Sequence, residues 1–106
     1  MATKQQFSSF EALLADSDRP VLVDFYADWC GPCHLMAQTL AQLAPQLKER
    51  LKVVKINTEK YPRLAAQYRV EALPTLTIFK DGQSIARVEG ALPADRLLSW
   101  IQQQGI

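Results

Sequence analysis

Residues 21–36 read VLVDFYADWCGPCHLM, and this stretch predicts a buried strand that passes into a helix through two cysteines. The run Val21–Tyr26 is rich in β-forming residues with little alternation, which is typical of a central strand covered on both faces. Pro32 fits the first turn of a helix, where its missing N–H has no partner to lose. The following residues predict an amphipathic helix that reaches about Arg50 and is kinked at Pro45. Its apolar stripe consists of Met36, Leu40, Leu43 and Leu47.

Strand-like and helix-like segments alternate through the rest of the chain. We expect further strands at residues 53–57, 76–79 and 85–88, the last two flanking the hairpin signal Asp81-Gly82. We expect shorter helices at residues 9–15, from Pro62 to near Tyr68, and from Pro93 onward. An edge strand at residues 4–7 is considered, although composition does not support it. This order predicts an α/β fold with a central mixed sheet of four to five strands and helices on both faces.

The length of 106 residues suits a single domain, residues 1–106. Apolar residues make up 48% and charged residues 22%, and the net charge is +1, so nothing favours nucleic acid or an anionic membrane as a partner. No apolar run is long enough to span a membrane, and the polar N-terminus has no signal-peptide core. We therefore expect a cytoplasmic protein, although a processed organellar form would look the same.

Cys30 and Cys33 are the two cysteines of the chain. A bond between them would close so short a loop that it stabilises the fold by only about 2 kcal/mol, which weakly motivates a structural role. Cys30 should lie where unpaired helix N–H groups and the helix dipole stabilise an anion, which favours its reactive thiolate over that of the more interior Cys33. Gly31 keeps the approach to Cys30 open, and Pro32 stiffens the turn.

Other chemistry was weighed at the same residues. Two chance cysteines in a core helix would explain the pair, but not its placement at a strand-to-helix junction. A structural zinc site normally takes four ligands, whereas Cys30, Cys33 and His34 are the only Cys and His residues. Cys30 to His34 also matches the Cys-x-x-Cys-His pattern of covalent haem attachment, but the strand–helix context and the lack of a secretory signal disfavour it. We expect no metal or cofactor, and His34 at the surface.

Asp24 is a lone carboxylate within an apolar strand. Burial would raise its pKa and make it a proton acceptor near neutral pH. The alternative is an exposed position, or a pairing with a cation such as Lys55, and the residues alone leave both open. At Leu73-Pro74, the low frequency of cis bonds, about 5–6% before proline, predicts a trans bond.

The segment Trp29-Cys30-Gly31-Pro32-Cys33 resembles the active site of the thioredoxin family, and the likeness extends over nearly the whole chain. It implies a thioredoxin-like fold and a thiol–disulfide oxidoreductase that reduces protein disulfides. In such an enzyme Cys30 would attack, Cys33 would resolve, and Asp24 would help Cys33 lose its proton, with Lys55 nearby. The other segments that carry the resemblance are residues 23–25, 55–57, 73–75, 79–82 and Gly90.

The resemblance also implies a cis bond before Pro74 and an apolar substrate groove in which the backbone at Leu73 pairs with the substrate like an added strand. The partners it implies are disulfide-containing proteins and a thioredoxin reductase as electron donor, and we expect a monomer. The groove would be formed by Trp29, Gly31, Pro32, Leu73, Pro74, Gly90 and Ala91. The departures are Tyr26 in place of a common Trp, His34 in place of Lys or Arg, and Gln38 in place of Pro.

Two alternative functions remain within this framework. A disulfide oxidase or isomerase would share the fold and differ in redox potential, although Pro32 between the cysteines is similar to the reducing members. A non-catalytic binding module would use the groove to hold a partner, with the cysteine pair incidental.

Overall fold

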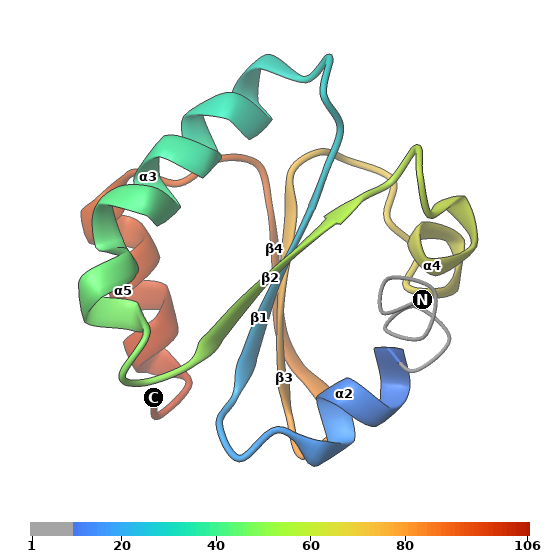
Figure 1. The fold of residues 1–106 in the computed structure, drawn as a ribbon. Helices are drawn as coiled ribbons and strands as arrows, with labels where there is room; N and C mark the ends of the chain where they lie inside the picture. The colour runs from blue at the N-terminus through green and yellow to red at the C-terminus, as the bar shows by residue number, and fades with distance from the viewer. Residues whose placement is uncertain (1–9) are drawn as a thin grey trace.

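The computed structural model describes residues 10–106, which form one sheet covered by helices on both faces (Figure 1). The predicted α/β fold with a mixed sheet is confirmed, with four strands among the described residues. The strand proposed at residues 4–7 lies outside that part of the chain. The helices are α2 (Phe10–Asp16), α3 (Gly31–Leu47), α4 (Pro62–Gln67) and α5 (Ala94–Gln103). The strands are β1 (Val21–Tyr26), β2 (Lys52–Asn57), β3 (Thr75–Lys80) and β4 (Gln83–Glu89).

The strand order is β2-β1-β3-β4, so the two strands β1 and β3 lie in the centre. Strand β1 runs parallel to β2, as expected for strands joined by a long helix, and Asp24 lies beside Lys55 in this register. Strand β3 is antiparallel to both β1 and β4. The turn between β3 and β4 is formed by Asp81 and Gly82, both with positive φ, as the hairpin signal predicts.

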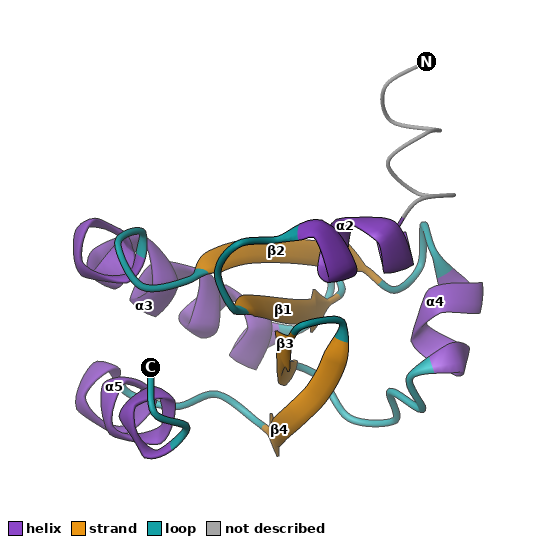
Figure 2. Ribbon diagram, turned by 90° about the horizontal axis from the view of Figure 1, so that it is seen from below, coloured by secondary structure: helices purple, strands orange, loops and turns teal. Residues whose placement is uncertain are grey.

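Helices α3 and α5 cover one face of the sheet, and α2 and α4 cover the other (Figure 2). A separate apolar cluster fills each of the two layers, because every central strand points alternate side chains to opposite faces. The cluster beneath α3 and α5 includes Leu22, Met36, Leu40, Leu43, Leu47, Leu76, Ile78, Leu97 and Ile101. The cluster beneath α2 and α4 includes Phe10, Leu14, Val21, Val23, Phe25, Ile56 and Phe79.

The alternation in β1 fixes the direction of Asp24. Val23 and Phe25 belong to the cluster beneath α2 and α4, whereas Leu22 belongs to the one beneath α3 and α5. Asp24 shares the face of Leu22 because side chains two positions apart point the same way. By the same rule Lys55 of β2, which lies next to Ile56, faces the α3 layer. The carboxylate therefore lies under the start of α3.

Several element boundaries differ from the predicted ones by a few residues. Helix α3 ends at Leu47, and the chain then turns as the backbone N–H groups of Arg50 and Leu51 both donate to the carbonyl of Leu47. The helix continues through Pro45, which lies in its interior. Pro93 caps α5 rather than opening it. Within residues 10–106, no helix combines the length and the apolar character that crossing a membrane requires.

Candidate active site

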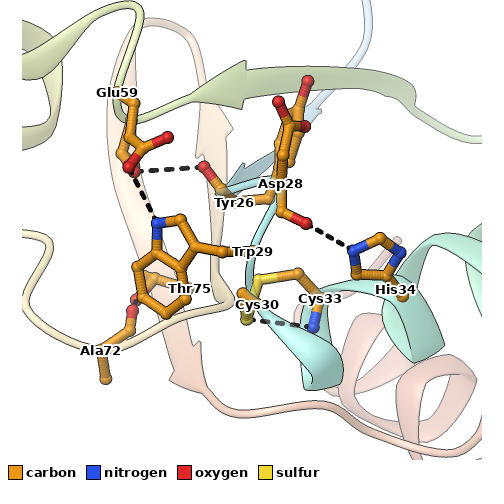
Figure 3. The surroundings of a disulfide bond; sticks show 10 residues. Tyr26, Asp28, Trp29, Cys30, Cys33, His34, Glu59, Ala72 and Thr75 are labelled. Atoms are coloured by element: carbon orange, nitrogen blue, oxygen red, sulfur yellow. Dashed lines mark hydrogen bonds between the residues drawn. A yellow bond between two sulfur atoms is a disulfide. The ribbon is translucent and has the colours of Figure 1, made fainter.

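Cys30 is the N-cap of α3, with an extended backbone that ends the turn after β1. Its Sγ accepts a hydrogen bond from the backbone N–H of Cys33 at 3.2 Å, one of the N–H groups that a helix start leaves without a helical partner. A disulfide joins Cys30 to Cys33, whose Cα atoms are 5.2 Å apart (Figure 3). When this bond is reduced, the same N–H group and the helix dipole favour a negative charge on the sulfur of Cys30.

Cys33 belongs to the buried stripe of α3, three residues before Met36. The expectation that Cys33 is the more interior of the two does not appear as a difference in exposure, because Cys30 is 4% exposed and Cys33 3% exposed in the disulfide form. The two cysteines differ in the hollows that they line. Cys30 lines a groove of about 440 Å³, and Cys33 lines a cavity of about 140 Å³.

The groove beside Cys30 has Trp29 on its wall, and this indole is 70% exposed. The indole N–H of Trp29 donates to Oε2 of Glu59 at 2.9 Å, which orients the ring beside the sulfur (Figure 3). Four of the predicted groove residues line this hollow, namely Trp29, Gly31, Pro32 and Leu73. The other residues on its wall are Cys30, Thr58, Val70 and Glu71.

Thr58, Val70 and Glu71 were missed because they follow β2 and α4 and reach Cys30 only when the chain is folded. Their sequence neighbourhood carries one usable signal, the Leu73-Pro74 pair shortly after Glu71.

The Leu73–Pro74 peptide bond is cis, as the family resemblance implies and against the trans bond that frequency alone predicts. The frequency argument fails because it contains nothing about the tertiary surroundings of the bond. Pro74 is buried, and its carbonyl accepts a hydrogen bond from the N–H of Gly90 at 2.8 Å. Gly90 has a φ of 92°, which a side chain would strain. Gly90 and its exposed neighbour Ala91 thus lie near Leu73, but neither lines the groove itself.

Asp24 is 1% exposed and lines the smaller cavity together with Cys33 and Lys55. Of the two alternatives for Asp24, the buried one is confirmed. Burial raises the pKa of Asp24 from 3.8 to about 6, and the positive charge of Lys55 lowers it in part. Among the described residues Oδ1 of Asp24 has no hydrogen-bond partner, and no ion pair joins it to the exposed Lys55. A buried carboxyl with such a pKa can take or give a proton near neutral pH.

The three departures from the family pattern lie at different distances from the cysteines. His34 is exposed on the first turn of α3, and its Nε2 lies 2.7 Å from the carbonyl oxygen of Asp28. Tyr26 is half-buried on the wall of the smaller cavity. Gln38 is exposed on α3. Over residues 10–106, no cluster of three or more His, Cys, Asp or Glu side chains is arranged to hold a metal ion.

The family model for thioredoxin matches residues 2–103 of the chain. Thioredoxin Y2, chloroplastic, of Arabidopsis thaliana is 57% identical over 95% of this chain, which spans 60% of the length of that relative. A thioredoxin-like protein of Synechocystis is 51% identical over 96% of this chain and 97% of its own length. Thioredoxin 1 of Nostoc is 45% identical over 91% of this chain and 90% of its own length.

Proposed function

This chain belongs to the thioredoxin family of thiol–disulfide oxidoreductases, and from that premise we propose that it reduces disulfide bonds in other proteins. The observation that carries the proposal is the bonded pair at the start of α3, with the sulfur of Cys30 on a helix N–H group and facing the groove. We propose that Cys30 is the nucleophile and Cys33 the resolving thiol. The whole of residues 1–106 is taken as one domain and as a monomer.

The reaction proceeds in two exchanges. The thiolate of Cys30 attacks one sulfur of the substrate disulfide, so that a mixed disulfide forms and the other substrate sulfur leaves as a thiolate. Cys33 then loses its proton and attacks the sulfur of Cys30, which releases the second substrate thiolate and leaves Cys30 bonded to Cys33. The substrate gains two electrons, the protein loses two, and the released thiolates take up protons.

Asp24 is proposed as the group that accepts the proton of Cys33. Both residues line the cavity of about 140 Å³, which has room for water between them. A pKa of about 6 leaves Asp24 largely ionised at neutral pH yet basic enough to take a proton. Lys55, on the neighbouring strand, favours the ionised form of Asp24 and thereby tunes this acceptor.

The groove is proposed as the site for the substrate chain. Its apolar wall, formed by Trp29, Pro32 and Leu73, suits the residues next to a substrate cysteine. We propose that the backbone at Leu73 pairs with the substrate as an added strand, beside Pro74, Gly90 and Ala91.

The electron donor is proposed to be a thioredoxin reductase or a ferredoxin–thioredoxin reductase, the two reductants that the family uses. The cytoplasm remains the proposed location. Because relatives include a chloroplastic protein, an organelle is the second candidate. Fractionating source cells and probing each fraction with an antibody to the chain would separate these locations.

Reduction of insulin, followed by its precipitation, tests the proposed activity. We expect Cys30→Ser to lose turnover entirely and Cys33→Ser to accumulate mixed disulfides, which non-reducing gels would detect. Full turnover by Cys30→Ser would refute the mechanism. A glutathione titration of the pair separates a reductase from an oxidase or isomerase, because the pair of an oxidant is reduced at ordinary glutathione ratios. Capture of partners by a variant that lacks both sulfurs would instead favour a binding module.

A further inference from the structure

Glu71 is the one charged side chain among the described residues that line the groove beside Cys30. It is exposed, and it follows α4 on the loop that leads to Pro74. A substrate segment lying in the groove next to Cys30 therefore passes within reach of a carboxylate. Because the rest of the lining is uncharged, this carboxylate is the feature of the wall that can distinguish substrates by charge.

Two further carboxylates surround the same opening. Glu59 is exposed and accepts the indole N–H of Trp29, a neutral donor that leaves its negative charge in place. Asp28, also exposed, directly precedes Trp29 and is contacted by the amide of Asn57 at 3.4 Å. The ion pairs of the described residues, Arg19 with Asp18 and Arg87 with Glu89, include none of the three. Lys60 and Arg69 are the nearest cations along these loops, so three negative charges face two positive ones.

The loop that carries Glu71 is held at both ends. Before it, the guanidinium of Arg87 on β4 donates to the carbonyls of Tyr68 and Arg69 at 2.5 and 2.6 Å. After it, the hydroxyl of Thr75 donates to the carbonyl of Ala72 at 2.5 Å. A fixed loop presents its charge without a large ordering cost when a substrate binds.

We propose that Glu71 selects disulfide substrates that carry Lys or Arg next to the attacked cysteine. This inference rests on the proposed function, since it names the substrate class of the same groove. Attraction between exposed charges is modest, so a basic neighbour should raise kcat/KM by about two- to fivefold over a neutral one at low salt. Salt of about 0.5 M should remove most of that preference, because the screening length then falls to a few ångströms.

Three disulfide peptides of one sequence, with Arg, Ala or Glu beside the cysteine, test the proposal with the reduced full chain. The expected order of kcat/KM is Arg above Ala above Glu. Glu71→Gln should bring the three rates together, and Glu71→Lys should reverse their order. Glu49→Lys makes the same change of net charge on the exposed turn after α3, about 25 Å of helix away from Cys30, and should keep the original order.

The outcomes separate this inference from the proposed function. Equal rates for the three peptides, or an order unchanged in Glu71→Lys, would overturn the role of Glu71 while leaving the reductase activity intact. An order that Glu49→Lys reverses as well would assign the preference to net charge and would also overturn it. If none of the peptides, including the neutral one, is reduced, the proposed function fails and this inference fails with it.

Discussion

Replacing Asp24 by Asn should make the protein more stable at neutral pH and leave its stability at acid pH much less changed. Asp24 lies at 1% exposure beneath α3, and burial raises its pKa from 3.8 to about 6. Between these two values the folded chain holds a proton that the unfolded chain has released, so stability falls as the pH rises through this window. Above it the loss is complete, and the difference between the two pKa values corresponds to about 3 kcal/mol.

Asn has nearly the same shape as Asp and does not titrate in this range, so the variant should escape that loss. We expect the difference in unfolding free energy between Asp24→Asn and the parent to grow by about 2 to 3 kcal/mol from pH ~4 to pH ~8. Urea unfolding of the disulfide form at several pH values measures this difference without titrating cysteines.

Glu49→Gln removes an exposed carboxylate from the turn after α3 and serves as the control, for which little change with pH is expected. A difference between Asp24→Asn and the parent that stays constant over this range would show that Asp24 is not charged at the expense of the fold. It would also remove the basis for its proposed role as proton acceptor.

Two further predictions follow from backbone contacts near the groove. Arg87→Met should lower the unfolding free energy by about 1 kcal/mol and raise the KM for insulin more than it lowers kcat, because the carbonyls of Tyr68 and Arg69 lose their donor; unchanged urea unfolding and unchanged KM would contradict this. Gly90→Ala should cost about 1 to 2 kcal/mol, since its φ is 92°, whereas Gly31→Ala adds a methyl group in open space and should not destabilise. Equal melting temperatures for the two glycine variants would show that no strain exists at Gly90.

The sequence by itself determined the order of elements and the position of the reactive pair. The β-forming run Val21–Tyr26 and the stripe from Met36 to Leu47 act between residues that are close along the chain, and such local patterns survive without knowledge of the fold. The cysteine pair at the junction of these two elements carries its chemistry in the same local way, through the N–H groups of the helix start.

Tertiary structure alone decided what surrounds that pair. Whether Asp24 is buried depends on which face of β1 lies under α3, and its pKa depends on the resulting loss of solvent. Glu59 and Glu71 reach the groove from loops far away in the sequence, so no spacing in the chain predicts them. Desolvation and charge act through space between atoms that only folding brings together, whereas periodicity and capping act along the chain.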